Sequence, residues 1–225
     1  MKLQEQLKAV RDATMARMPK SVIDTFTNSI ENIRNDQLQQ KALQVGDTIP
    51  NIPLIDNYGN SIDLKEIQQN EFLILNFYRG GWCPYCNMEL REFERLRDAF
   101  KKADTDIVAI SAELPQLATQ TVQKNTISYP ILTDRNAAFM KAIGIVFELD
   151  EASKKEFDNF GMDFSKIHGN HNNQLPVPAI YVIDRHQKIV FIHFEADYMT
   201  RMEPSELLKT LKMINYSKNK HYENN

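Results

Sequence analysis

Residues 72–90 read FLILNFYRGGWCPYCNMEL, and this stretch decides the fold. Residues 72–78 form a short apolar run of the kind that becomes a buried strand. Residues 79–82 follow as a glycine-containing loop, after which apolar residues recur at helical spacing as far as residue 100. Cys83 and Cys86 therefore stand where a buried strand ends and a helix begins.

This placement of the cysteines predicts reactive sulfur. Cysteines three positions apart on a helix lie about 5–6 Å apart at Cβ, and slight tightening brings their sulfurs within bonding range. The first turn of a helix offers unpaired N–H groups and a partial positive charge. Both favour a thiolate and lower a cysteine pKa from ~8.5 to between ~3.5 and ~7.5. Arg79 adds positive charge before the pair, whereas Glu89 opposes it.

The chain contains only these two cysteines, which excludes a fold braced by several disulfides and a four-thiolate zinc site. Two other interpretations of the pair remain open. Buried core cysteines are one, which the loop glycines and the helix start disfavour. Half of a metal site completed by His168 and His171 is the other, although a histidine pair in a loop is usually solvated. We expect neither a metal nor an organic cofactor.

The charge balance argues against nucleic acid as a partner, because 27 basic and 30 acidic residues are interleaved to a net charge of −3. No apolar run approaches the ~20 residues of a membrane span. The first residues lack the basic-then-apolar layout of a secretory signal. We therefore expect a cytoplasmic protein in a reducing environment, with no nucleic-acid or membrane partner.

Outward from the cysteines, strands and helices alternate along the chain. Strands are expected at residues 106–111, 129–133, 179–184 and 188–194, and helices at 114–125, 137–143 and from Pro204 onward. The last two strands form a hairpin across residues 185–187. The alternation predicts an α/β fold with a mixed central sheet flanked by helices, in a domain at residues 43–216.

Three segments lie outside this alternation. Residues 1–42 predict an N-terminal helical extension, whose second helix has a capping-box-like start at Ser21 and Asp24. We expect the extension to pack on the main domain or to pair with a second copy in a homodimer. Residues 146–177 are a polar and aromatic insertion, expected to cover one edge of the site. Residues 217–225 form a polar tail that we expect to be frayed.

Residues 77–90 resemble the peroxiredoxin-like branch of the alkyl hydroperoxide reductase/thiol-specific antioxidant (AhpC/TSA) family. The similarity extends over residues 43–214, since residues 45–47, 175–184 and 197–204 resemble the family's opening, late strand and closing motif. The resemblance implies a thioredoxin-like fold.

A residue-by-residue comparison also shows where this sequence departs from the peroxiredoxin pattern. The peroxidatic cysteine corresponds to Cys86, whereas Cys83 stands at the family's threonine or serine and Arg79 at its proline. Pro178 occupies the place of an arginine, whose role the resemblance leaves to Arg79 or Arg201. The cysteine pair, with Pro178 just before a strand, is also similar to thioredoxin. That similarity implies a cis peptide bond before Pro178, packed against the cysteines.

The resemblance implies first a thiol-dependent peroxidase. Cys86 attacks hydrogen peroxide or an organic hydroperoxide, and Cys83 resolves the resulting sulfenic acid. A thioredoxin- or glutaredoxin-like reductant then restores both thiols. Trp82 and Tyr85 shape the mouth of the site.

Two alternative functions stay open. In a protein disulfide reductase, Cys83 attacks, Cys86 releases the substrate and Pro178 positions the substrate backbone. In a redox-sensing interaction protein, the disulfide changes how the N-terminal helices or the insertion dock on a partner. Fold analogy does not decide among the three functions, because function lies in the site.

Overall fold

Strand β3 (Phe72–Phe77) is an inner strand of a seven-stranded sheet, and all six of its residues are buried. The computed structural model describes the backbone of residues 1–223 and the side chains of residues 1–217. β3 pairs in parallel with β4 (Thr105–Ser111) and antiparallel with β8 (Ala179–Asp184). Parallel and antiparallel neighbours flank the same strand, so the sheet is mixed and the predicted α/β fold is confirmed.

The outer strands complete the order β2-β1-β5-β4-β3-β8-β9. They are β1 (Leu54–Ile55), β2 (Ser61–Ile62), β5 (Ile131–Thr133) and β9 (Ile189–Phe194). The expected hairpin of β8 and β9 is present, with Ala179 opposite Phe194.

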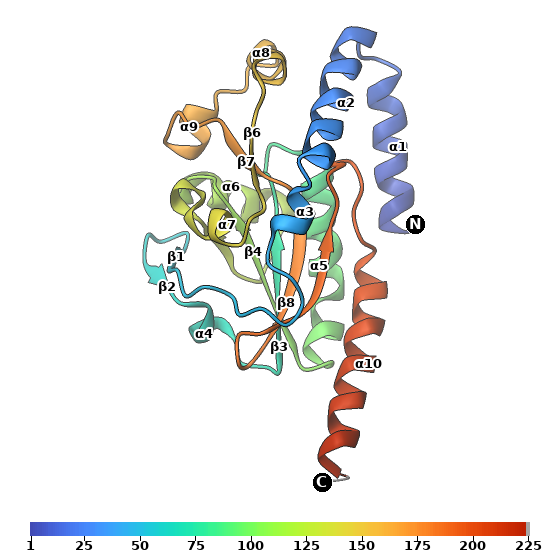
Figure 1. Cartoon of the computed structure of the whole chain (residues 1–225), viewed down its shortest axis with the longest axis vertical. Coiled ribbons are helices and arrows are strands. Elements are labelled where there is room, and N and C mark those ends of the chain that lie inside the picture. The colour runs from blue at the N-terminus through green and yellow to red at the C-terminus, as the bar shows by residue number, and fades with distance from the viewer. Residues whose placement is uncertain (224–225) are drawn as a thin grey trace.

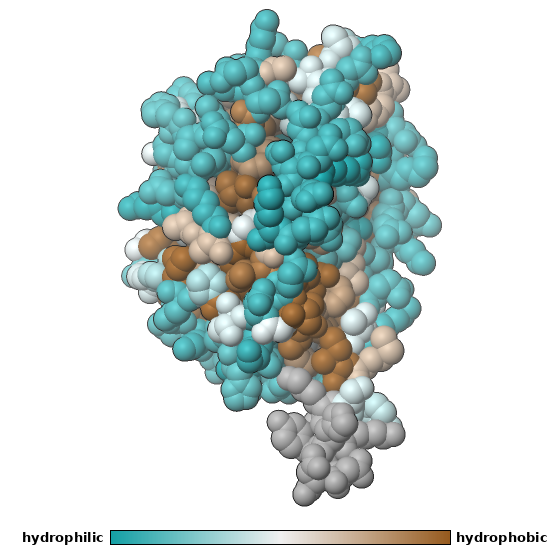
Figure 2. All heavy atoms as spheres, in the orientation of Figure 1, coloured by the Kyte–Doolittle hydropathy of each residue, from teal (hydrophilic) through white to brown (hydrophobic). Residues whose placement is uncertain are grey.

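Helix α5 (Pro84–Lys101) follows β3 directly after the loop and begins with a proline, which is well suited to the first helical position. It packs against β4, and α10 (Pro204–Glu223) runs beside it in Figure 1. The remaining helices of the main domain are α4 (Leu64–Ile67), α6 (Pro115–Asn125) and α7 (Ala138–Ala142), with a short 3-10 helix η1 (Arg135–Ala137) before α7. Figure 2 shows a largely hydrophilic face in which apolar side chains gather in a band toward α10.

The N-terminal extension forms helices α1 (Leu3–Met15), α2 (Lys20–Asn35) and α3 (Leu38–Lys41). α1 packs on α5, and α2 packs on the insertion (Figure 1). Helix α2 begins at Lys20 after Pro19, so the predicted capping box at Ser21 and Asp24 is wrong. Neither side chain caps the helix: the backbone carbonyl of Ser21 accepts the hydroxyl of Thr25, and the Asp24 side chain pairs with Lys20 one turn earlier.

The insertion consists of two strands and two helices. Strands β6 (Val146–Glu148) and β7 (Gln174–Pro176) pair with each other, and α8 (Glu151–Asn159) and α9 (Phe164–His168) lie between them in the chain. Phe157 and Phe164 from these helices pack edge-on against Trp82, at ring-centroid distances of 5.7 and 5.5 Å. The insertion therefore covers one edge of the cysteine loop, as expected.

Two other expectations are wrong. The structure has no cis peptide bond within residues 1–223, so the bond before Pro178 is trans. Val177 and Pro178 together link the end of β7 to the start of β8, and the N–H of Val177 donates to the carbonyl of Ile145 at 2.8 Å, which keeps the chain extended. The expected frayed tail is helical through Glu223, because no proline or glycine stops α10 there, and residues 224–225 lie outside the described residues.

Candidate active site

Both cysteines occupy the amino-terminal turn of α5, as the sequence predicted. Cys83 is the residue that precedes the helix, and Cys86 lies at its third helical position. Neither sulfur is in a disulfide, and the residues are only 1% and 0% exposed. The site is therefore a buried dithiol at a helix start.

The loop before α5 takes its shape from Gly80 and Glu113. Gly80 has φ +148°, and a Cβ there would come within 2.3 Å of the Trp82 indole nitrogen. The next N–H, that of Gly81, donates to a Glu113 carboxylate oxygen at 2.9 Å, and the Asn87 amide donates to the Gly81 carbonyl at 2.8 Å. Only glycine fits this close approach, which brings the chain from β3 into the helix start.

Arg201 reaches the cysteines from a segment just before α10. Its Nη2 donates to the sulfur of Cys86 at 3.1 Å, and its Nε donates to Glu89 at 2.9 Å. The Arg201–Glu89 ion pair is almost fully buried, with side-chain exposures of 3% and 1%. Of the two arginines that the sequence offered for this role, Arg201 is the one whose guanidinium donates a hydrogen bond to a sulfur, whereas Arg79 contacts Cys86 through its backbone.

Arg79 lies beside the pair in a different way. Its guanidinium carbon stands 4.1 Å from the centroid of the Tyr198 ring, 4.8 Å from that of Trp82 and 5.6 Å from that of Phe157. These are cation–π distances. The buried Nε of Arg79 has no hydrogen-bond partner, and no carboxylate in the described part of the chain pairs with the side chain. Its charge lowers the pKa of Cys83 and also opposes the rise in the pKa of Tyr198 that burial causes.

The two sulfurs differ in acidity because they compete for one negative charge. For Cys83, burial alone would raise the pKa, but a hydrogen bond from Cys86 and the charges of Arg79 and Arg201 outweigh it and lower the pKa to about 6. For Cys86, burial and the neighbouring Cys83 raise the pKa, against the attraction of Arg201. The resting pair therefore carries a thiolate on Cys83 that accepts a hydrogen bond from the Cys86 thiol.

Two buried carboxyl groups also titrate near neutrality. Burial raises the pKa of Glu89 to about 7, although Arg201 opposes this shift. Burial likewise raises the pKa of Glu113 to about 7, against the hydrogen bond from Gly81. Negative charge on Cys86 raises both pKa values further. The two acids can therefore take up or release a proton when the charge on the sulfurs changes.

A cavity of about 220 Å³ opens beside Cys83, whereas Cys86 lies behind it and outside the lining. Its walls come from α1, α2, α8 and the segment before α10, and they are mostly apolar. The lining residues are Thr14, Met15, Met18, Ile23, Phe26, Thr27, Arg79, Trp82, Cys83, Pro84, Tyr85, Phe157, Phe160, Met162, Tyr198 and Met199.

Most of the predicted site residues converge. Cys83, Cys86, Arg79, Trp82 and Arg201 lie together, and Tyr85 lines the cavity as expected. Pro178 is buried next to them, where it shares a small void with Arg79 and Tyr198. The acid Glu113 was missed, although its place just after a central parallel strand is a known signal for site residues.

The histidines do not join the cysteines. His168 is buried, stacks on Phe164 at 5.5 Å and has its pKa lowered to about 4 by burial, whereas His171 is exposed. No group of three or more His, Cys, Asp or Glu side chains in the described part of the chain is arranged to hold a metal ion. No helix within residues 1–223 is long and apolar enough to cross a membrane.

Comparison with known proteins agrees with this geometry. A sequence model of the AhpC/TSA family matches residues 45–192. The thiol-disulfide oxidoreductase ResA of Halalkalibacterium halodurans is 26% identical over 170 residues, which cover 75% of this chain and 78% of that protein. Peroxiredoxin Bcp of Escherichia coli is 25% identical over 103 residues, which cover 46% of this chain and 65% of that protein.

Solved structures show the same fold. The peroxidoxin BcpB of Mycobacterium tuberculosis superposes with a TM-score of 0.60 at 20% identity, covering 76% of this chain and 98% of that one. At this identity the likeness concerns the fold, and it confirms the predicted thioredoxin-like architecture.

Proposed function

Because the chain belongs to the AhpC/TSA family, we propose that it is a thiol-dependent peroxidase that reduces hydrogen peroxide and organic hydroperoxides through Cys83 and Cys86. One observation carries the proposal, namely the hydrogen bond from the buried Arg201 guanidinium to the sulfur of Cys86. A cation at this distance stabilises a thiolate and the negative charge that develops on the departing oxygen.

The reaction begins with Cys83 as a thiolate and Cys86 as the thiol hydrogen-bonded to it. As the Cys86 sulfur attacks the distal peroxide oxygen, its proton passes to the Cys83 thiolate and the O–O bond breaks. The departing hydroxide or alkoxide takes that proton from Cys83 and leaves as water or an alcohol. Cys86 is now a sulfenic acid, and Cys83 is again a thiolate.

Resolution follows within the same turn of helix. The Cys83 thiolate attacks the sulfenic sulfur of Cys86, the S–S bond forms and hydroxide leaves. In sum the two sulfurs lose two electrons and the peroxide gains them. A dithiol reductant of the thioredoxin or glutaredoxin class then restores both thiols by two exchange steps. The proposal includes a reducing, cytoplasmic setting, because such reductants operate there.

The cavity beside Cys83 supports organic hydroperoxides among the substrates. An engineered apolar cavity of about 150 Å³ accepts benzene, and the cavity here is larger, at about 220 Å³. Its methionine and phenylalanine walls favour an apolar body, whereas Arg79 and Cys83 offer polar groups at one end. Homodimer formation stays a prediction, which light scattering would test.

A second function has an observation of its own. Cys83 lines the cavity and has the lowered pKa, whereas Cys86 lies behind it. This arrangement favours a protein disulfide reductase in which Cys83 attacks the substrate and Cys86 releases it.

Two serine variants separate the functions. If Cys86 is peroxidatic, Cys83→Ser consumes one equivalent of peroxide and stops at a sulfenic acid on Cys86, because the chain has no third cysteine. Cys86→Ser then lacks the fast peroxide reaction. A reductase gives the opposite result: Cys86→Ser traps mixed disulfides with protein substrates, and Cys83→Ser reacts with no hydroperoxide. Peroxide stoichiometry and mass spectrometry on both variants provide the measurement.

A further inference from the structure

The position of the Arg201 guanidinium depends on the backbone of its own turn. We call residues 197–201 the arginine turn. Besides Glu89 and Cys86, the guanidinium contacts two carbonyls of this turn, since its Nη1 donates to those of Tyr198 and Thr200. If the turn changes shape, the guanidinium moves with it and Cys86 loses its donor.

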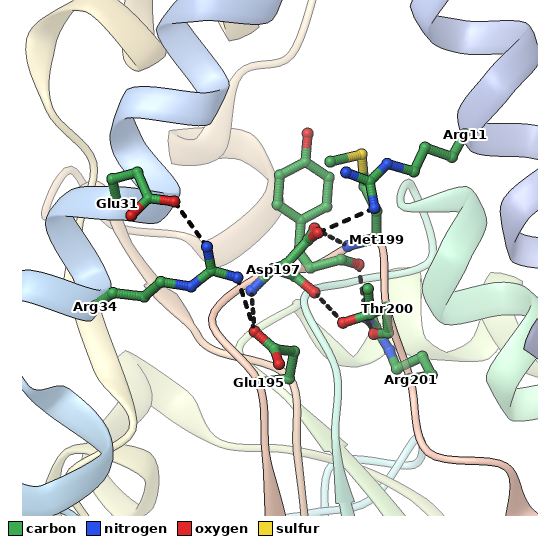
Figure 3. Close-up of polar contacts among 9 residues, drawn as sticks. Arg11, Glu31, Arg34, Glu195, Asp197, Met199, Thr200 and Arg201 are labelled. Atoms are coloured by element: carbon green, nitrogen blue, oxygen red, sulfur yellow. Dashed lines mark hydrogen bonds and ion pairs between the residues drawn. The ribbon is translucent and has the colours of Figure 1, made fainter.

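Asp197 fixes the shape of the arginine turn. Its Oδ1 accepts the N–H of Met199 at 3.0 Å, and its carbonyl accepts both the N–H and the hydroxyl of Thr200, at 3.0 and 2.9 Å (Figure 3). An aspartate that accepts backbone N–H groups two residues ahead is a standard way to hold a tight turn. The second carboxylate oxygen points to α1, where the Nη1 of Arg11 lies 3.3 Å away.

The N-terminal extension also holds the segments on either side of the turn. On one side, Glu195 pairs with Arg34 of α2 at 3.3 Å and accepts the N–H of Asp197 at 3.0 Å (Figure 3). On the other side, Glu203 accepts the N–H groups of the first two residues of α1, both at 3.3 Å. Three acids around Arg201 thus each have a partner from residues 1–35, and all of these lie outside the family match at residues 45–192.

We propose that Asp197 is a positioning residue for the cysteine pair, and that Arg11 acts through it: together they hold the arginine turn in the shape in which Arg201 reaches Cys86. This inference rests on the proposed function for its relevance to peroxide, because it concerns the sulfur that the peroxidase uses. Its direct effect is on the acidity of Cys86, which is measurable without any peroxide.

Other ionisable groups also face the pair and must stay in place during the test. Arg79 comes from the loop before α5, Glu89 from α5, and Glu113 from the segment after β4. Three tyrosines complete the set, Tyr78, Tyr85 and Tyr198. Variants at residues 11 and 197 keep all of these side chains, although Arg11 and Asp197 act on the pKa of Tyr85 and Asp197 also acts on that of Tyr198. Loss of the Asp197 negative charge by itself would lower the pKa of a nearby thiol, so a raised Cys86 pKa in that variant reports on the turn.

The test uses the full chain with Cys83→Ser, in which Cys86 is the only thiol. Its pKa is read from the thiolate absorbance and from the pH dependence of iodoacetamide alkylation. Asp197→Ala should raise the pKa of Cys86 and slow alkylation at neutral pH about tenfold, because one pKa unit changes the thiolate fraction tenfold. Arg11→Ala should slow it only about twofold, since a partly exposed ion pair contributes little.

Lys8→Ala is the matched control. It removes an ion pair from the same helix, but Lys8 pairs with Asp12 at 2.5 Å and both side chains are exposed. It should leave alkylation unchanged. In the double variant, Arg11→Ala should add nothing to Asp197→Ala, because both act through one carboxylate.

An unchanged Cys86 pKa in both the Asp197→Ala and Arg11→Ala proteins, with a raised one in Arg201→Met, would overturn the proposal. If Asp197→Ala does not fold, Arg11→Ala decides alone, because its side chain is 42% exposed and its removal is tolerable. A protein whose alkylation responds as expected but whose Cys86 ignores peroxide would refute the peroxidase and leave the positioning role standing.

Discussion

Replacing Arg201 with methionine removes the donor to Cys86 and keeps an unbranched chain of similar reach. A hydrogen bond to a charged group contributes about 1.5–3 kcal/mol, and about 1.36 kcal/mol corresponds to one pKa unit. Loss of the 3.1 Å contact should therefore raise the pKa of Cys86 by about one to two units. Because the thiolate is the nucleophile, the peroxide reaction should slow about ten- to a hundredfold at neutral pH.

Glu89 loses its ion-pair partner in this variant, so a second substitution at Glu89 is needed as a control. Removing one partner of a buried ion pair costs about 3–5 kcal/mol when the other stays charged. The pKa of Glu89 is already raised to about 7 by burial despite Arg201, so without the arginine this carboxyl becomes protonated at neutral pH. The double variant Arg201→Met with Glu89→Gln removes the lone carboxyl, and it should show the same slow peroxide reaction with a more stable fold.

The assay follows oxidation in a single turnover. Trp82 is the only tryptophan, and it directly precedes Cys83, so its fluorescence should report disulfide formation after rapid mixing with peroxide. Circular dichroism establishes that each variant is folded. If folded Arg201→Met oxidises as fast as the wild type, the guanidinium does not activate Cys86 and the mechanism above is wrong.

Met18→Gln places an amide in the cavity wall, so it should slow the reduction of cumene hydroperoxide several-fold and leave the reduction of hydrogen peroxide unchanged. The control Met213→Gln, at an exposed residue of α10, should change neither rate. Equal losses of both rates in Met18→Gln would argue against the cavity as a binding site. Gly80→Ala should lower the free energy of unfolding in urea by about 1–3 kcal/mol more than Gly59→Ala does, because Gly59 also has a positive φ but has open space around it. An equal decrease in both variants would show that the close approach in the loop is unimportant. The pKa of Glu113 is raised from 4.5 to about 7 by burial, so this group favours the folded state below pH 4.5 and loses that contribution as pH rises to about 7. Glu113→Gln should therefore flatten the decline of stability across this range, by an amount on the order of 3 kcal/mol, and an unchanged slope in pH-dependent denaturation would contradict the assignment.

The strand, loop and helix around the cysteines could be predicted because their signals are local. An apolar run, two glycines and a helical repeat stand next to one another in the chain, and both sulfurs lie where that pattern puts them. Trp82 and Arg79 belong to the same stretch and follow from it. The alternation of later strands and helices likewise predicted the mixed sheet.

Long-range contacts account for what the sequence left open. Arg201 meets Cys86 across 115 positions, and no periodicity indicates which of two arginines takes that role. Glu113 is recognisable only once β3 and β4 are known to end at the same edge of the sheet. The trans bond before Pro178 reflects its place between two strands, where extended backbone continues from one sheet to the next. A local resemblance to thioredoxin carried no information on that context.

Some residues of the site lie outside the part of the chain that matches the family model. Residues 45–192 supply the sheet, the cysteine helix and both buried acids, which suffices to place a dithiol at a helix start. The arginine on Cys86 and two of the helices that wall the cavity, α1 and α2, come from outside that range. A chain shortened to the family domain would thus keep the cysteines and lose the donor that acidifies Cys86, together with the part of the apolar wall beside Cys83 that α1 and α2 form. The reactivity of the pair therefore belongs to the whole chain, because the extension and the arginine turn build the part of the site in which the sulfurs meet a substrate.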